Sequence, residues 1–221
     1  MNIASYIDHT ILKPTATIEE VERVCYEALK YQFAAVCVPP LYVKTVKSLL
    51  AGSGIKIATV IGFPFGYSAV EAKLAEVVLA VSDGVDELDM VINITAIKNK
   101  DWLFIANEIN TILPFIRNYN RVIKVIIESG LLTDNEIIKC CELYGAAGVD
   151  FIKTSTGYAE RGATVEAVRL MRQHLPAHVK IKASGGIRTF SFAQELLLAG
   201  ADRLGCSGSM DIVEQFNKTM V

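Results

Sequence analysis

The 221-residue chain contains no apolar run that approaches the roughly 18 residues needed by a membrane-spanning helix. Its first residues, MNIASYIDHTILK, lack the basic segment and following apolar segment of a secretion signal. The 22 basic residues nearly balance the 24 acidic ones, so the basic excess typical of nucleic-acid-binding surfaces is missing as well. These absences predict a cytoplasmic protein that binds neither membranes nor nucleic acid.

Cysteine and histidine are too few and too scattered to suggest a metal site. The five cysteines are odd in number and form no CxxC pair, and several lie in apolar stretches, which predicts buried, reduced thiols. None of the three histidines is grouped with cysteines, so we expect no metal. His9 is expected to be a hydrogen-bonded neighbour of Asp8 rather than a base, and His174 and His178 are expected to be exposed.

Apolar residues, by contrast, are abundant at 52% of the chain, and their pattern is regular. Short apolar runs, many rich in β-branched residues, alternate with longer runs of helical period. Eight strands are predicted, at residues 5–10, 34–38, 56–63, 87–93, 122–129, 149–155, 179–185 and 201–207. No linker rich in Gly, Ser or Pro divides the chain. This pattern predicts an α/β fold with one domain over residues 1–221, a (β/α)8 TIM barrel, and leaves an open doubly wound sheet as the alternative.

Local signals predict where helices begin and end. Three pairs have capping-box spacing and predict helix starts: Thr17 with Glu20, Ser68 with Glu71, and Thr133 with Glu136. Four glycines stand where helices should stop: Gly52, Gly84, Gly148 and Gly200. Pro114 is expected to end or kink the helix that precedes the fifth strand.

A short internal repeat draws attention to three strand positions. DGVDELD begins at residue 83, AGVDFIK at residue 147 and AGADRLG at residue 199. The shared glycine and aspartate are explained by helix-to-strand turn chemistry. The residue three places after the aspartate is Asp89, Lys153 or Gly205, a set that core packing alone would not select.

Charged side chains lie near the predicted carboxyl ends of several strands, where barrels of this kind form their active sites. Asp8, Asp89, Lys153 and Lys182 would converge there on one cavity. The alternative is a buried ion-pair network with a structural role, of which Lys124 with Glu128 on the fifth strand is a possible case. Because buried ion pairs often fail to repay the cost of desolvation, chemistry is the more economical explanation.

Two neighbouring lysines permit a specific chemistry. A lysine attacks a carbonyl only as the neutral amine, and its ordinary pKa near 10.4 leaves little of that form at neutral pH. Burial and a nearby cation both lower the pKa of a lysine, and Lys182 would supply the cation beside Lys153. Lys153 could then form a Schiff base with an aldehyde, while Asp89 moves protons.

Glycine-rich loops follow the seventh and eighth strands, where many barrels bind phosphate. The candidate phosphate residues are Gly185, Gly186, Gly205, Ser207 and Gly208. Arg188 could add a donor or lie on the surface. Cys37 could be a core thiol or reach the cavity, and Thr156 could bind the substrate or cap the next turn.

The runs FIKTSTG, KASGGIRT, ELDMVIN and IDHTILKP together resemble the deoxyribose-phosphate aldolase family, in the same order and from Tyr6 to about Met210. The resemblance implies a class I aldolase without a metal or other cofactor, and a phosphorylated sugar as its small-molecule substrate. It implies that Lys153 forms the Schiff base, that Asp89 donates and accepts protons, and that Lys182 perturbs Lys153. It places Asp8 and Cys37 near the substrate, and the glycine-rich loops around its phosphate.

The chain departs from the family in two places. Some members carry a basic residue after the TSTG run, where this chain has Tyr158, and this predicts weaker phosphate binding or the use of other donors. Some members also have a tail tyrosine for proton transfer, whereas this chain ends NKTMV. Two other functions stay open: a Schiff-base aldolase for a different phosphorylated sugar or keto acid, and a non-catalytic metabolite-binding protein. A homodimer agrees with the family, although no sequence patch demands one.

Overall fold

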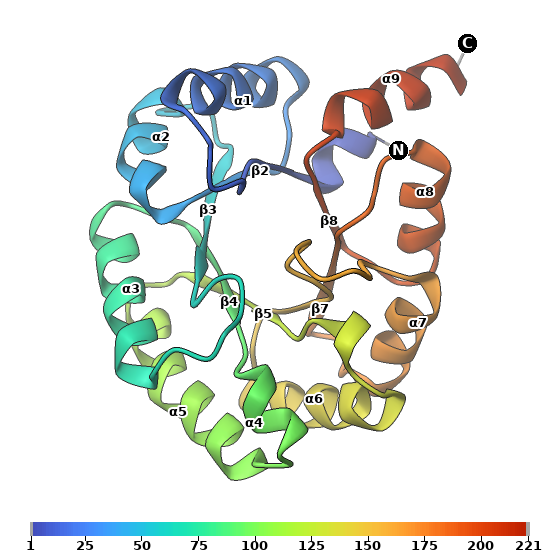
Figure 1. Ribbon diagram of the computed structural model, residues 1–221. Helices are drawn as coiled ribbons and strands as arrows, with labels where there is room; N and C mark the ends of the chain where they lie inside the picture. The colour runs from blue at the N-terminus through green and yellow to red at the C-terminus, as the bar shows by residue number, and fades with distance from the viewer. Residues whose placement is uncertain (1, 220–221) are drawn as a thin grey trace.

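The computed structural model describes residues 2–219, whose eight strands close into one parallel barrel (Figure 1). Each strand pairs with the next along the chain, and β8 pairs with β1 to complete the barrel. The strands are β1 (Ile7–Thr10), β2 (Ala35–Val38), β3 (Lys56–Ile61), β4 (Glu87–Val91), β5 (Val122–Ile126), β6 (Phe151–Lys153), β7 (Lys180–Ser184) and β8 (Arg203–Cys206). The predicted barrel is therefore confirmed, and the open sheet is excluded. The last two residues of the NKTMV ending lie outside the described residues.

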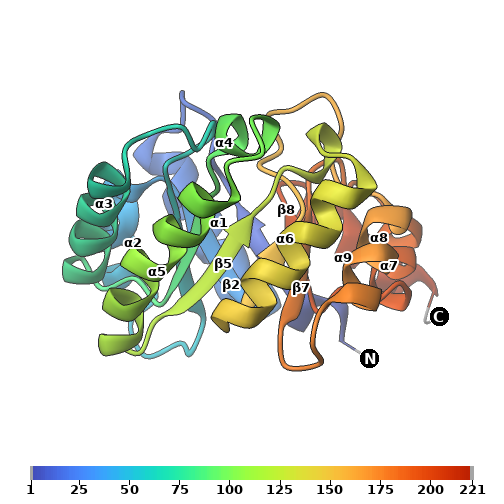
Figure 2. The same ribbon diagram turned by 90° about the horizontal axis from the view of Figure 1, so that it is seen from below.

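Helices surround the barrel, as Figures 1 and 2 show from two directions. They are α1 (Ile18–Tyr31), α2 (Val43–Leu49), α3 (Val70–Ser82), α4 (Ile94–Lys98), α5 (Trp102–Asn118), α6 (Asp134–Ala147), α7 (Val165–His174), α8 (Phe190–Leu198) and α9 (Ser209–Thr219), with short 3-10 helices η1 (Ile3–Tyr6), η2 (Pro40–Tyr42) and η3 (Ser129–Leu131). The main apolar core lies between the outer faces of the strands and these helices. Within residues 2–219, no helix has both the length and the apolar character to cross a membrane.

Two of the three predicted capping boxes are confirmed. Thr17 and Thr133 each cap a helix and exchange hydrogen bonds with the glutamate three residues later. The prediction for Ser68 is wrong, because α3 has Ala69 as its N-cap and makes no side-chain cap bond. Glu71 then occupies the second helical position, one residue short of the place that a capping box requires. Its charge still interacts favourably with the positive end of the helix.

Pro114 lies inside α5, so of the two predicted effects the end of the helix is wrong and the kink stays a prediction. A residue with an N–H group at this position would bond to the carbonyl of Asn110. Both residues are exposed, so water can satisfy that carbonyl. The opposite face of α5 buries Ile105, Ile109 and Ile112, and this packing maintains the helix through the proline.

The aspartates of the three repeats form hydrogen bonds that join the beginnings of neighbouring strands. Each carboxylate accepts the backbone N–H of an isoleucine on the preceding strand at 2.8–3.0 Å: Asp86 from Ile57, Asp150 from Ile123 and Asp202 from Ile181. These bonds join β4 to β3, β6 to β5 and β8 to β7. The turn chemistry inferred from the repeat is confirmed. Side-chain alternation then directs the residue three places later toward the barrel interior.

Candidate active site

Asp89, inside the barrel on β4, accepts hydrogen bonds from three lysines. Its Oδ2 atom accepts from Lys153 Nζ at 2.8 Å and from Lys182 Nζ at 2.7 Å. Its Oδ1 atom accepts from Lys124 Nζ at 2.9 Å. None of the four residues is more than 2% exposed. The structure thus brings together Asp89, Lys153 and Lys182, as the strand-end pattern predicted.

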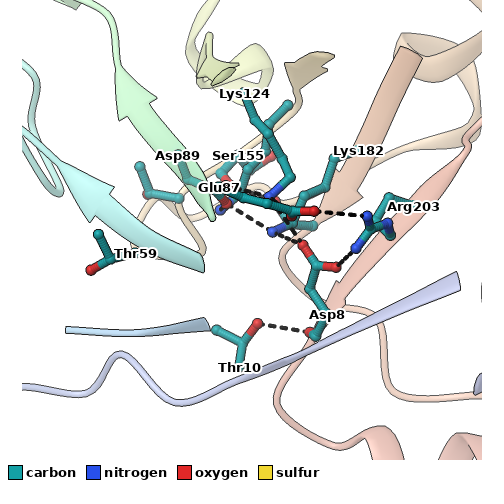
Figure 3. Close-up of polar contacts among 12 residues, drawn as sticks. Asp8, Thr10, Thr59, Glu87, Asp89, Lys124, Ser155, Lys182 and Arg203 are labelled. Atoms are coloured by element: carbon teal, nitrogen blue, oxygen red, sulfur yellow. Dashed lines mark hydrogen bonds and ion pairs between the residues drawn. The ribbon is translucent and has the colours of Figure 1, made fainter. Parts of the chain in front are cut away.

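Asp8 and Glu87 add two more carboxylates to this network (Figure 3). One oxygen of Asp8 lies 2.5 Å from Lys182 Nζ and 3.5 Å from Lys124 Nζ, and the other accepts from Arg203. Glu87 lies 2.5 Å from Lys124 Nζ and accepts from Arg203 at 3.1 Å. Every charge in the network therefore contacts at least one group of opposite sign.

Strand register explains why these side chains meet. Lys153 on β6 is level with Lys182 on β7, and Asp89 on β4 is level with Lys124 on β5. Because neighbouring residues on a strand point to opposite faces, these positions share the inner face of the barrel. Closure of the barrel then brings β4 opposite β6 and β7, which are far from it in sequence.

Sequence reasoning misses the part that Lys124, Glu87 and Arg203 play in this network. The suggested pairing of Lys124 with Glu128 is wrong, because Lys124 bonds to Asp89 and Glu87 instead. Glu128 follows the end of β5 with left-handed backbone, φ 52°, and its side chain turns elsewhere. Strand alternation was the signal that could have revealed Glu87, because it lies two residues before Asp89 and therefore on the same strand face.

The surroundings lower the pKa of one of the three lysines and raise the pKa of the other two. Burial lowers the pKa of Lys153, and the cation of Lys182 adds to this effect against the pull of Asp89. Burial also disfavours the charge of Lys182, but Asp8 and Asp89 outweigh it and raise the pKa of this lysine. The pKa of Lys124 is likewise raised, because its carboxylate partners outweigh its burial. The site therefore favours a neutral amine on Lys153 beside two ammonium groups.

Charge balance in the network supports the same assignment. The carboxylates of Asp8, Glu87 and Asp89 are matched by the cations of Lys124, Lys182 and Arg203. A protonated Lys153 would add a fourth positive charge, and a buried charge without its own partner is costly. A neutral Lys153 avoids this cost and has the lone pair needed to attack a carbonyl.

Lys153 lines a cavity of about 310 Å³, into which both predicted phosphate loops also project. Gly185 and Gly186 of the β7–α8 loop line the cavity with Gly205 and Ser207, and Gly208 comes next in the chain. Gly185 and Gly186 have φ of 87° and 78°, in the left-handed region that favours glycine. The structure therefore places the amine of Lys153 and two glycine-rich loops around one space.

Gly205 has a steric role as well as a place in the cavity wall. A Cβ atom at this position would lie 2.9 Å from the Cβ of Ser184 and 3.1 Å from the Cε of Lys182. The glycine therefore leaves room for the stem of Lys182. This explains why the third copy of the repeat holds glycine where the other two copies hold charged residues.

Tyr158 links two loops at the mouth of the cavity. Its hydroxyl donates to the carbonyl of Leu12 at 3.0 Å, and its ring meets Phe63 edge-on with centroids 5.5 Å apart. Lys13 and Arg188 also line the cavity and bring positive charge to it. Sequence reasoning names Arg188 as a candidate donor but misses Lys13, which becomes visible only when the β1–α1 loop is placed beside Tyr158.

Thr156 and Cys37 differ in their access to the cavity. Thr156 lines it, but its hydroxyl already donates to Glu128 and accepts the N–H of Tyr158 at 3.0 Å. Cys37 is fully buried with Ala58 and Val60, and burial raises the pKa of its thiol to about 11. Cys37 is therefore a core thiol that lies next to the lysine network.

Known proteins resemble this chain in both sequence and fold. A model of the DeoC/LacD family of aldolases matches residues 2–210. A deoxyribose-phosphate aldolase of Thermoanaerobacter sp. (strain X514) is 47% identical over 219 residues, which cover 99% of this chain and 98% of the relative. The solved structure of an aldolase designated QR15 has a TM-score of 0.93 and 40% identity, and the match covers 100% of this chain and 98% of that one. A deoxyribose phosphate aldolase of Aeropyrum pernix, described as tetrameric, has a TM-score of 0.91 and 33% identity, with 99% and 92% covered.

Proposed function

Because the chain belongs to the DeoC/LacD family of aldolases, we infer that it reversibly cleaves 2-deoxy-D-ribose 5-phosphate to acetaldehyde and D-glyceraldehyde 3-phosphate. The observation that carries this proposal is the setting of Lys153. Its amine lines a cavity with two glycine-rich loops, while a cation and an ionised carboxylate lie behind it. A sugar phosphate needs these two features together, an amine for its aldehyde and a cradle for its phosphate.

The reaction follows from the chemistry of the neutral amine. Lys153 attacks C1 of the open-chain aldehyde, and loss of water gives a protonated imine. A base removes the proton of the C3 hydroxyl, the C2–C3 bond breaks, and its electron pair enters the imine to give an enamine. D-Glyceraldehyde 3-phosphate leaves with the new carbonyl. Protonation of the enamine at C2 and hydrolysis release acetaldehyde and restore the amine, and these steps use no metal or other cofactor.

Protons can move through the shared carboxylate of Asp89. Although burial opposes it, the lysines around Asp89 hold the pKa of this carboxyl well below its usual value. A carboxylate with so low a pKa is a weak base by itself. Its Oδ2 atom nevertheless joins Lys153 to Lys182, so a proton taken up at one amine can reach the other. We assign to Asp89 and Lys182 a joint role in proton transfer, directly or through water.

The phosphate is proposed to bind at the other end of the cavity. Backbone N–H groups near Gly186, Ser207 and Gly208 can approach it closely, because glycine has no side chain to keep an anion away. Lys13 and Arg188 supply positive charge at the same end. These two cations compensate for Tyr158, which stands where some members of the family have a basic residue.

Reduction with borohydride in the presence of acetaldehyde tests this function. The imine would become a stable secondary amine, and mass spectrometry should find one ethyl group on Lys153. The Lys153→Met variant is the matched control, because it retains the buried Lys124 and Lys182 and the exposed Lys13. In a separate assay without borohydride, the wild-type protein should release acetaldehyde from 2-deoxy-D-ribose 5-phosphate, and the Lys153→Met variant should not.

Two results would contradict the proposal. An ethyl group located mainly on another lysine would exclude Lys153 as the Schiff-base residue. Trapping at Lys153 without release of acetaldehyde from 2-deoxy-D-ribose 5-phosphate would indicate an aldolase for a different phosphorylated sugar.

We propose that the protein acts in the cytoplasm, where this substrate would arise from the breakdown of deoxyribonucleotides. We also propose that it forms a homodimer. The Aeropyrum pernix relative is described as tetrameric, so related chains do assemble. Large apolar side chains such as Leu41, Leu103 and Leu198 are 72–82% exposed in the single chain. Light scattering of the purified protein should give the mass of two chains, and the mass of one or of four would contradict the dimer.

A further inference from the structure

His9 lies on the outer face of β1, opposite in direction to Asp8, and is 2% exposed. Its Nε2 atom lies 2.7 Å from Glu27 Oε2 on α1, and its Nδ1 atom lies 2.8 Å from Ser209 Oγ on α9. The expected hydrogen bonding of His9 is confirmed. Its partners, however, are two residues from distant parts of the chain and not Asp8.

Ser209 connects this histidine to the loop that borders the cavity. It is fully buried and is the first residue of α9, which leaves the end of β8 through residues 207 and 208 (Figure 1). Its hydroxyl also lies 3.1 Å from the carbonyl oxygen of Cys206, the last residue of β8. This hydrogen bond joins Cys206 to Ser209, and Ser207, which lines the cavity, lies between these two residues in the chain.

The position of the ring proton of His9 follows from the chemistry of its partner Glu27. A carboxylate can only accept, so Nε2 of His9 carries the proton that is donated to Glu27. Burial lowers the pKa of His9 against the pull of Glu27, which favours the neutral ring with an unprotonated Nδ1. The single hydroxyl proton of Ser209 is shared between two acceptors, Nδ1 of His9 at 2.8 Å and the carbonyl oxygen of Cys206 at 3.1 Å. Glu27, His9 and Ser209 form one chain of hydrogen bonds, with Arg23 3.8 Å from the second oxygen of Glu27.

Stability alone is a poor reason for this arrangement. Buried polar chains often contribute no more stability than apolar side chains of the same size, but they fix the positions of the groups they join. The group joined here is the beginning of α9, and it adjoins the wall of the substrate cavity. Accurate placement of the beginning of α9 therefore matters chiefly for the shape of the cavity wall.

We propose that Glu27 and His9 are positioning residues that hold Ser209, and through it Ser207 and Gly208, in the place that receives the substrate phosphate. His9 and Glu27 do not line the space occupied by the sugar and act only through Ser209. The proposal rests on the proposed function for its substrate. It adds a link from α1, on the outside of the barrel, to the phosphate end of the site.

Two variants of His9 separate the two ends of the chain. His9→Asn places an amide near the former Nδ1 position and retains a contact with Ser209. His9→Gln places an amide near the former Nε2 position and retains a contact with Glu27 instead. Ser209→Ala removes the hydroxyl itself. Glu27 is partly exposed, and Glu27→Gln keeps the size and shape of its side chain. This variant therefore remains informative if a variant at a buried position folds poorly.

The readout is the ratio of kcat/KM for 2-deoxy-D-ribose 5-phosphate to kcat/KM for 2-deoxy-D-ribose. Loss of positioning should reduce this ratio about tenfold in Ser209→Ala and His9→Gln, in line with the loss of one or two buried hydrogen bonds. His9→Asn should recover most of the ratio, because it retains the contact with Ser209. Calorimetric titration with inorganic phosphate should show a parallel loss of affinity.

Phosphate titration also separates this proposal from the proposed function. If the unmodified protein does not cleave the sugar phosphate but binds phosphate more tightly than Ser209→Ala does, the positioning chain stands and the assigned substrate does not. Equal phosphate affinity in Ser209→Ala and the unmodified protein would overturn the positioning chain. An equal fall in kcat/KM for both sugars, with the ratio unchanged, would overturn it as well.

Discussion

Lys153 and Lys182 donate to the same atom, Oδ2 of Asp89, at 2.8 and 2.7 Å. Two positive charges so close together repel each other, and this favours loss of a proton from one of them. Lys182 has a second carboxylate partner, Asp8, at 2.5 Å. Within residues 2–219 no second carboxylate lies within ion-pair distance of Lys153. The difference in partners explains why the neutral form is favoured at Lys153 and not at Lys182.

Lys182→Met should raise the pKa of Lys153. The variant loses a cation that disfavours the ammonium form and leaves three carboxylates with two permanent cations. Each unit of increase lowers the neutral fraction of the amine about tenfold at neutral pH. The rate of borohydride trapping with acetaldehyde, followed against pH, should shift to higher pH. Lys139→Met, at an exposed lysine, is the control, and an unchanged profile in Lys182→Met would remove Lys182 from the mechanism.

Asp8→Asn should destabilise the protein in a pH-dependent manner. Although burial opposes it, Lys182 and its neighbouring cations lower the pKa of Asp8 from 3.8. A lowered carboxyl pKa stabilises the fold above the unfolded value, and this contribution disappears as the pH falls through the folded value. The variant should therefore lose roughly 3–5 kcal/mol at neutral pH, the cost of breaking a buried ion pair.

Urea unfolding of both proteins over a series of pH values measures this effect. The difference in free energy of unfolding should be largest above about pH 5 and should shrink below about pH 4. Asp134→Asn, at an exposed aspartate, should show a small difference throughout. A difference for Asp8→Asn that is independent of pH would show that its charge does not stabilise the fold.

Lys13→Met should weaken binding of the phosphorylated substrate. Lys13 lines the cavity and also pairs with the half-buried Glu20 at 2.5 Å, so it can reach a phosphate by a small movement. Loss of a hydrogen bond between charged groups should raise KM for 2-deoxy-D-ribose 5-phosphate about tenfold or more. Steady-state kinetics with Lys44→Met as the surface control would measure this. Adding Tyr158→Lys should restore part of the loss, and no change in KM for Lys13→Met would assign the phosphate to other donors.

Gly205→Ala should disturb the network sterically. Its new methyl group would lie 2.9 Å from the Cβ of Ser184 and 3.1 Å from the Cε of Lys182, and overpacking of this kind costs roughly 1–3 kcal/mol. Gly208→Ala is the matched control, because the nearest atom to its methyl group lies 3.9 Å away. Thermal unfolding should show a lower midpoint for Gly205→Ala only. Equal midpoints in the two variants would contradict the proposed packing of Lys182.

Much of the architecture could be predicted from local sequence, because it depends on local physical chemistry. The alternation of strands and helices follows from hydrophobic period, and the capping boxes at Thr17 and Thr133 follow from short-range hydrogen bonds. Lys153, Asp89 and Lys182 could be found because their strand-end positions in a parallel barrel face a common space. Ser68 and Pro114 were harder to interpret, since a one-residue shift of a helix start and the packing of a helix face override the local signals.

The sequence by itself determined which residues would point into the barrel, because strand alternation decides the face of each side chain. Only the tertiary structure decided which of them touch. Lys124 meets Asp89 across a register that no local pattern specifies, and His9 meets Ser209, 200 residues later, because closure of the barrel pairs β1 with β8. Contacts of this kind depend on how distant segments are placed in three dimensions, and so they appear only when the barrel is closed.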